Sequence, residues 1–246
     1  MRRYDFTQSR LYVETDLATG AVVTCRANQV NYLCNVLRLG PGDQILIFNG
    51  RDGEWRARIG GARKGAMTLN AESQVRLQQG GPDIDYLFAP LKRARLDYMV
   101  QKATEMGVAR LRPIFTRHTT PERINSVRMR ANAIEAAEQC GILRVPQVLE
   151  PETLDGALAH WGAERRLIFC DEDSTAADPL AALRGLAPGP IAVLIGPEGG
   201  FDASERERIA AQPFALSISL GPRILRADTA AVAALALVNA TLGDWR

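Results

Sequence analysis

The sequence has few of the residues that build metal centres and disulfide frameworks. Its 246 residues include two histidines and four cysteines, and the cysteines, at positions 25, 34, 140 and 170, form no Cys-x-x-Cys pair. These counts argue against a zinc site and against a disulfide-stapled domain, and they fit a reducing cytosol. We therefore predict a cytoplasmic protein without a metal.

Long apolar runs and the common nucleotide-binding fingerprints are also missing. The longest strictly apolar stretch, residues 230–238, is too short to cross a bilayer, and the N-terminus has no apolar signal core. No Gly-x-Gly-x-x-Gly or Gly-Lys-Ser/Thr segment is present, so a dinucleotide or P-loop interpretation lacks its characteristic motif. We expect a soluble protein with no membrane partner.

Lysine is scarce, whereas arginine is abundant. Of the 30 basic residues only three, at positions 64, 92 and 102, are lysines, and the net charge is only +2. Arginine suits phosphate and base recognition because its planar group donates two parallel hydrogen bonds. A genomic codon bias explains the same count, and composition alone favours that simpler explanation.

The hydrophobic pattern divides the chain into two parts. The first part contains a short apolar run at 44–48, an alternating strand at 54–59, a short helix near 29–37 and frequent turns. This pattern predicts a small β-barrel. After a Gly- and Pro-containing linker at 78–82, strands and helices alternate, which is typical of a parallel α/β sheet. We predict domains at 1–76 and 77–246.

Two similar loops near the C-terminus each connect an apolar strand pattern to a helix pattern. They read Gly196-Pro-Glu-Gly-Gly200 and Gly221-Pro-Arg-Ile-Leu-Arg-Ala-Asp228. Loops that follow the carboxyl ends of parallel strands are where α/β proteins bind ligands, so both loops are expected to form one site. Taken alone, the first loop is better interpreted as a tight turn before a helix with a capping box at Asp202 and Glu205 than as a phosphate site.

The second loop contains two arginines between a buried strand and an apolar helix predicted at 229–242. Such a position is costly unless the charges have anionic partners or open onto a site. A structural ion pair is a fair interpretation of Arg223, and Asp228 is a candidate partner or helix cap. For Arg226 the pattern favours a functional role.

Five ordered segments resemble one family of RNA-modifying enzymes. They are Leu194–Phe201, Leu220–Thr229, Gln101–Val108, Glu135–Gly141 and Val36–Asp43. Together they are similar to the SPOUT-class methyltransferases that modify N3 of a specific uridine in bacterial 16S ribosomal RNA. Because the segments occur in the same order along the chain as in the family, the resemblance covers most of the chain.

The chain departs from the family pattern at three places. Asp228 stands where the family usually has glutamate, which keeps the charge on a shorter side chain. Thr116-Arg117-His118 replaces a Ser/Thr-Glu-Arg segment, and Ile142 replaces an arginine. The last two changes affect a region where the family contacts RNA.

The resemblance implies a fold, a cofactor and a set of site residues. The expected fold is a PUA-like β-barrel followed by a trefoil-knotted α/β domain that binds S-adenosylmethionine and forms a homodimer acting on 16S rRNA in the small ribosomal subunit. Arg226 is the implied catalytic residue, with Asp228 or Glu198 orienting it or accepting the proton. The implied cofactor residues are Ile195, Gly196, Gly200, Leu220, Gly221, Ile224 and Leu225, and the candidate RNA contacts are Arg2, Arg3, Arg10, Arg38 and Arg223.

Two other functions remain open from the residues themselves. A conventional nucleotide-binding α/β enzyme would use the 196–200 loop for phosphate and would bind ATP or NAD. A non-catalytic RNA-binding or assembly factor would have kept the fold without the reaction. Degenerate loops would favour the second alternative, but both loops here are intact.

Overall fold

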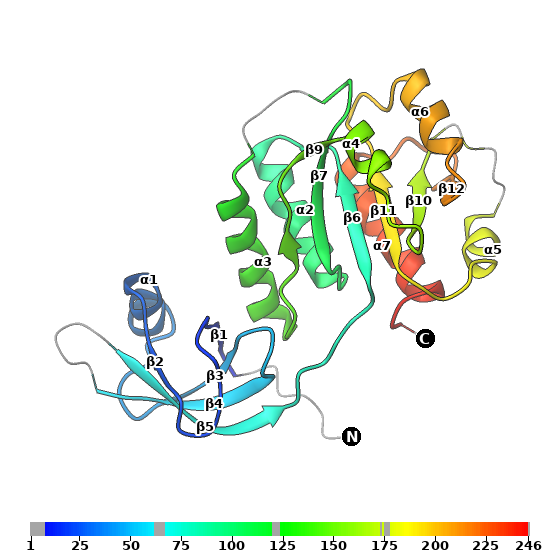
Figure 1. Cartoon of the computed structure of the whole chain (residues 1–246). Coiled ribbons are helices and arrows are strands. Elements are labelled where there is room, and N and C mark those ends of the chain that lie inside the picture. The colour runs from blue at the N-terminus through cyan, green and yellow to red at the C-terminus, as the bar shows by residue number, and fades with distance from the viewer. Residues whose placement is uncertain (1–7, 62–66, 120–123, 173, 175–177, 246) are drawn as a thin grey trace. The chain divides into compact units, whose positions relative to one another are not determined.

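The structure is a computed structural model that describes residues 8–61, 67–119, 124–172, 174 and 178–245 (Figure 1). The chain forms two compact units, one of residues 1–80 with 137–145 and the other of residues 81–136 with 146–246. The sequence predicted a single boundary after residue 76. The nine-residue return differs from that expectation because Ala137 and Leu143 pack on Phe48 of the first unit.

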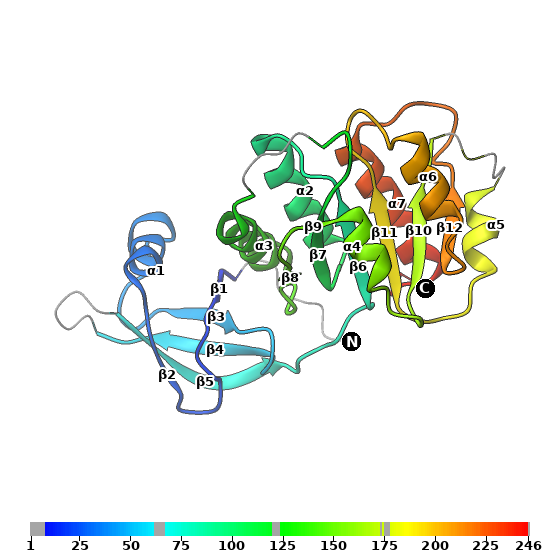
Figure 2. The same cartoon turned by 45° about the horizontal axis from the view of Figure 1, so that its top comes forward.

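The first unit is a curled five-stranded sheet (Figures 1 and 2). The first two strands of its order pair in parallel, and the other neighbours are antiparallel. In spatial order the strands are β1 (Arg10–Tyr12), β3 (Gln44–Phe48), β4 (Glu54–Ile59), β5 (Thr68–Arg76) and β2 (Val22–Thr24).

The core of this unit follows the predicted alternation with one exception. Trp55, Ala57 and Ile59 are buried as expected, but Glu54 is buried too, at 1% exposure. Its carboxylate accepts a hydrogen bond of 2.9 Å from Nε of Arg10, whose side chain is 2% exposed. The structure therefore corrects the prediction that Arg10 contacts RNA phosphate, because this side chain is enclosed in an ion pair.

The short helix predicted at 29–37 is divided into two pieces. An α-helix, α1 (Ala27–Asn31), continues as the π-helical turn η1 (Tyr32–Val36). Shortly after η1, Arg38 adopts a φ of 58°, and it is the only non-glycine residue with positive φ among the described residues. Its side chain is exposed. This conformation is uncommon for a side chain of that size.

The second unit contains a parallel sheet. Its strands lie in the order β12 (Ala215–Ile218), β10 (Arg166–Cys170), β11 (Ile191–Ile195), β6 (Ile84–Phe88), β7 (Arg110–Phe115) and β8 (Gln147–Val148), and β9 (Glu152–Thr153) also pairs with β7. All these pairs are parallel. The alternating pattern after residue 82 is thus confirmed as a parallel α/β sheet.

Helices cover both faces of this sheet (Figure 2). On one face α2 (Arg93–Glu105), α5 (Pro179–Arg184) and α7 (Ala227–Thr241) contact one another or the strands. On the other, α4 (Leu154–Ala159) and α6 (Ala203–Ala210) pack on Leu87, Phe169 and Leu194. The helix α3 (Ser126–Cys140) belongs to both units by its contacts. Burial on both faces explains why the central strands are almost entirely apolar.

The helix α2 packs against α7, the C-terminal helix. In α2, Met99, Val100 and Ala103 are almost completely buried, and the helix ends before Gly107, which has a φ of 77°. The amide of Asn239 in α7 donates a hydrogen bond of 2.8 Å to the carbonyl oxygen of Met106. This bond joins the C-terminal ends of α2 and α7. This burial along one face and the glycine after the last turn are typical of an amphipathic helix with a glycine cap at its C-terminal end.

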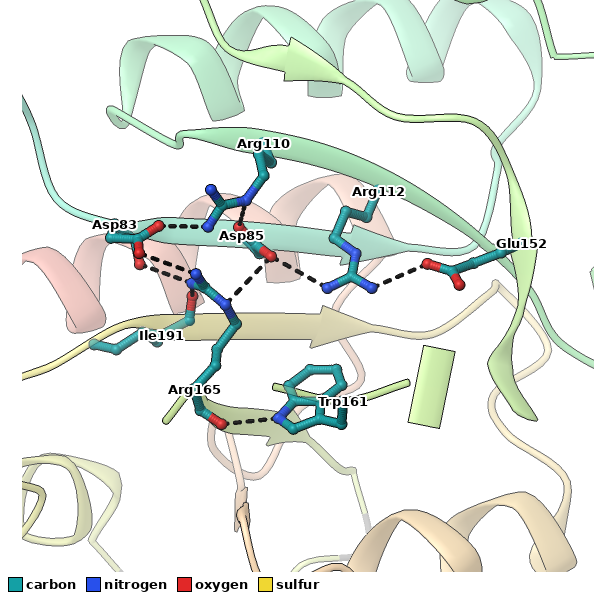
Figure 3. Close-up of polar contacts among 8 residues, drawn as sticks. All are labelled: Asp83, Asp85, Arg110, Arg112, Glu152, Trp161, Arg165 and Ile191. Carbon is teal, nitrogen blue, oxygen red and sulfur yellow. Dashed lines mark hydrogen bonds and ion pairs between the residues drawn. The ribbon is translucent and has the colours of Figure 1, made fainter. Parts of the chain in front are cut away.

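The amino ends of β6 and β7 carry a network of paired charges (Figure 3). Asp85, 2% exposed, is bonded by Nε of Arg110 and lies 3.2 Å from Nη1 of Arg112. Arg165 donates to Asp83 at 3.0 Å and to the carbonyl oxygen of Ile191 at 2.8 Å, while Arg112 also pairs with Glu152 at 3.0 Å. The charged side chains at this end of the sheet are therefore paired with one another.

Within the described part of the chain, no helix is both long enough and apolar enough to span a membrane.

Candidate functional site

A cavity of about 540 Å³ opens at the carboxyl ends of β10, β11 and β12. Three loops line it, one after each of these neighbouring strands, together with the first turns of α7. Among the predicted site residues, the structure brings together Ile195, Gly196, Glu198, Gly200, Leu220, Gly221, Arg223, Ile224, Leu225 and Arg226. Asp228 is not among the lining residues and lies in the first turn of α7.

Glycines allow the loop after β11 to pack tightly. A Cβ on Gly196 would lie 2.6 Å from the ring of Phe201, so no larger residue fits without a rearrangement. Gly200 has a φ of 69°, and a Cβ there would lie 3.0 Å from Oε1 of Glu172. The backbone of this loop therefore forms part of the cavity wall.

The loop after β12 carries two arginines without carboxylate partners. Arg226 is the N-cap residue of α7 and makes no side-chain capping bond, and its side chain is exposed. Among the described residues, neither Arg223 nor Arg226 has an acidic group within 4.0 Å. Asp228 accepts a hydrogen bond of 2.9 Å from the amide of Thr229 instead. The structure therefore gives no support to an ion pair between Arg223 and Asp228.

Sequence reasoning missed the third wall of the cavity. It consists of Cys170, the last residue of β10, and of Asp171 and Glu172, which follow the strand. Asp171 pairs at 2.8 Å with Arg206 of α6. Arg95 of α2 also lines the cavity and pairs with Glu198. The apolar run before Asp171 and the acidic residues after it were a usable signal, because ligands bind at the carboxyl ends of all such strands.

The segment that departs from the family pattern supports the glycine loop. The amide of Arg117 donates to Oε1 of Glu205 at 2.8 Å, and the same carboxylate accepts from the amide of Asp202 through the predicted capping box. Nδ1 of His118 lies 3.2 Å from the carbonyl oxygens of both Gly199 and Gly200. The loop after β7 thus fixes the loop after β11.

The thiol of Cys170, which lines the cavity, and the buried hydroxyl of Tyr86 are kept protonated. Burial raises the pKa of the Cys170 thiol to about 12. Burial, with a smaller effect of Cys170 and Asp228, raises the pKa of Tyr86 well above its usual value, and the Tyr86 hydroxyl lies 3.0 Å from Sδ of Met99. Neither group is therefore suited to act as a nucleophile or base at neutral pH. No cluster that would hold a metal occurs in the described ranges.

Comparison with known proteins decides the family. A model described as "RNA methyltransferase domain" matches residues 79–239, and one described as "RNA methyltransferase PUA domain" matches residues 26–72. The chain belongs to this RNA methyltransferase family. The methyltransferase domain thus includes the cavity and all three of its loops.

Individual relatives are similar to this chain over most of its length. Ribosomal RNA small subunit methyltransferase E of Rickettsia conorii is 29% identical, covering 94% of this chain and 95% of that protein. The enzyme of the same name from Synechocystis is 30% identical, with coverages of 95% and 78%. A solved structure of this enzyme from Neisseria gonorrhoeae, bound to S-adenosylmethionine, is 28% identical, with a TM-score of 0.83 and coverages of 97% and 100%.

The predicted fold, a PUA-like first domain followed by an α/β methyltransferase domain with a parallel sheet, is therefore confirmed. Of the remaining predicted RNA contacts, Arg38 is exposed on the first unit, whereas Arg2 and Arg3 lie outside the described residues. The roles of the individual site residues remain proposals, which we develop next.

Proposed function

We propose that the protein is an S-adenosylmethionine-dependent methyltransferase that modifies N3 of uridine 1498 in 16S ribosomal RNA. Family membership and relatives similar over the whole chain support this substrate. The observation that carries the proposal is the position of Arg226. It lies without an acidic partner among the described residues, at a cavity lined by glycine loops.

The residues present fit the cofactor. The cavity volume is within the range of sites for small molecules, roughly 300–1,000 Å³. Ile195, Leu220 and Leu225 offer apolar surface for an adenine ring. A Cβ on Gly221 would meet nothing within 4 Å, so the backbone there is open to close approach by a ligand. When bound, S-adenosylmethionine supplies an electrophilic methyl group on a positively charged sulfur.

Arg226 would stabilise the uracil ring during the reaction. The N3 proton must leave, and the freed electron pair then forms the bond to the methyl carbon as the bond from that carbon to sulfur breaks. Negative charge spreads meanwhile over the two carbonyl oxygens beside N3. A guanidinium group placed at these oxygens stabilises that charge as it develops. The amino end of α7, to which Arg226 belongs, adds a favourable dipole.

Asp228 and Glu198 are the proposed groups for orienting Arg226 or accepting the proton. Asp228 lies two residues after Arg226, in the first turn of α7. Glu198 lines the cavity and is paired with Arg95 in this structure. For Glu198 to take either role, it has to exchange this partner when substrate binds.

The proposed RNA contacts are basic residues of both units. Arg223 lies beside the cavity without an acidic partner among the described residues, and Arg38 is exposed on the PUA-like domain. Arg2 and Arg3 complete the set from the sequence. We place the reaction in the cytoplasm, on the small ribosomal subunit, and propose a homodimer as the active form.

The decisive experiment measures methyl transfer from labelled S-adenosylmethionine to small subunits that lack the modification, followed by mass mapping of the product. N3-methyluridine at a single position is the expected result. Tight cofactor binding without methyl transfer would contradict the proposed substrate but support the proposed cofactor. Binding of ATP or NAD in place of S-adenosylmethionine would support the nucleotide-binding alternative.

A further inference from the structure

Three carboxylates line the cavity, and they differ in their partners. Asp171 is paired with Arg206, and Glu198 is paired with Arg95. Glu172 has no hydrogen bond or ion pair with any residue that the structure describes. An ionised carboxylate only accepts hydrogen bonds, so Glu172 is the acidic group of the cavity that is available to a ligand with donor groups.

Glu172 is also placed against the glycine loop. Its Oε1 lies 3.0 Å from the position that a Cβ of residue 200 would occupy, and Gly200 has a φ of 69°. A side chain at position 200 would therefore be strained and would press on the carboxylate. The absence of a side chain at Gly200 leaves room for Glu172 at the cavity wall.

The sheet order places Glu172 between the two signature loops. β10 lies between β12 and β11, so the residues that follow β10 lie between the loop at Gly196 and the loop at Gly221. These two loops are the proposed binding surfaces for adenine. The ribose is bonded directly to adenine, whereas the α-amino group of the methionine part is at the opposite end of the cofactor.

We propose that Glu172 accepts hydrogen bonds from the two ribose hydroxyls of the cofactor. The two carboxylate oxygens match a pair of neighbouring hydroxyl donors, and the sulfonium group has no hydrogen to donate. An acidic residue serves the same purpose in other parallel α/β proteins that bind nucleosides beyond the strand ends. This inference rests on the cofactor of the proposed function and is independent of which nucleotide is methylated.

Two neutral-sulfur probes test the assignment by titration calorimetry. Both S-adenosylhomocysteine and 5′-methylthioadenosine contain adenine and ribose, but only S-adenosylhomocysteine also carries the amino-acid part. Glu172→Gln should weaken the binding of both probes by the same factor, about tenfold, the loss expected for hydrogen bonds to a charged group. Glu207→Gln, the same change at an exposed residue of α6 outside the cavity, should leave both affinities unchanged.

The results of this titration distinguish a contact with the ribose from a contact with the amino group and from no contact. Weaker binding of S-adenosylhomocysteine alone would assign Glu172 to the amino group and overturn the ribose contact, and unchanged binding of both probes would overturn any contact. If the wild-type protein binds neither probe, the cofactor of the proposed function fails, and this inference fails with it. Equal urea midpoints for the two variants and the wild type would show that the loss is not caused by unfolding.

Discussion

At the amino edge of the parallel sheet, all six charged side chains of the network in Figure 3 have a partner of opposite charge. At the carboxyl edge, Arg223, Arg226 and Glu172 have none among the described residues. A paired, buried charge contributes to a unique packing, whereas an unpaired charge at a cavity is free for a ligand. We therefore expect substitutions at the amino ends of the strands to change stability, and substitutions of the three unpaired residues at the carboxyl ends to change the proposed chemistry.

The largest effect on the reaction is expected from Arg226→Ala. Removing a group that stabilises developing charge should lower kcat by roughly 10²–10³-fold, while cofactor affinity and the free energy of unfolding remain unchanged. Single-turnover methyl transfer measures the first and calorimetry the second. Arg223→Ala is the matched variant, and it should raise the KM for RNA with little change in kcat. Normal turnover by Arg226→Ala would disprove its catalytic role.

At the amino ends of the strands, Asp85→Asn should lower the free energy of unfolding. The change leaves Arg110 and Arg112 without their shared buried anion, and breaking such a pair costs roughly 3–5 kcal/mol. Urea denaturation measures this loss. The folded fraction should keep its kcat at low temperature, because the network is distant in topology from the loops of the cavity. A lower kcat in fully folded Asp85→Asn protein would contradict the separation of stability and chemistry between the amino and carboxyl ends of the strands.

Gly196→Ala tests the close packing of the first signature loop. The added Cβ would lie 2.6 Å from the ring of Phe201, so the ring or the loop has to move. We expect cofactor affinity to fall about tenfold, which corresponds to roughly 1.4 kcal/mol. Gly199→Ala is the control in the same loop, since its nearest neighbour would be at 3.5 Å, an ordinary contact. Equal losses in both variants would contradict this explanation.

Asp83→Asn should change the acid sensitivity of the fold. Burial alone would raise the pKa of Asp83, but the hydrogen bonds and charges of Arg165 and Arg110 hold it below its ordinary value of 3.8. The stabilisation is therefore present above about pH 3.8 and is lost as the pH falls through the lower value of the folded state. In the variant, unfolding free energy should depend less steeply on pH in this acid range. At pH 7 the cost should be below about 1 kcal/mol, because Asp83 is half exposed.

The smallest effect concerns His118. An asparagine amide can take the position of Nδ1 and donate to the carbonyl oxygens of Gly199 and Gly200, whereas a glutamine amide takes that of Nε2. His118→Asn should bind the cofactor like the wild type, and His118→Gln should bind about two- to threefold more weakly, as expected for an exposed hydrogen bond. Equal affinities in the two variants would show that the contact does not position the loop.

Residue pattern predicted much of the local structure. The alternation of the strand near 54–59 was correct at Trp55, Ala57 and Ile59, because periodic burial depends on spacing along the chain. The capping box at Asp202 and Glu205 was correct for the same local reason. The predictions failed where burial depends on distant residues: Arg10, assigned to RNA, is enclosed by Glu54, which lies 44 positions along the chain.

The sequence by itself determined the two signature loops, the change from a β-rich to an α/β pattern and the family resemblance, because each is encoded in neighbouring residues. Only the tertiary structure decided that β10 lies between β11 and β12, which adds Glu172 to the site. It also decided which charges are paired, since Asp85 and Arg165 meet only when parallel strands align. Strand order and ion pairing depend on long-range contacts, and no local pattern contains them.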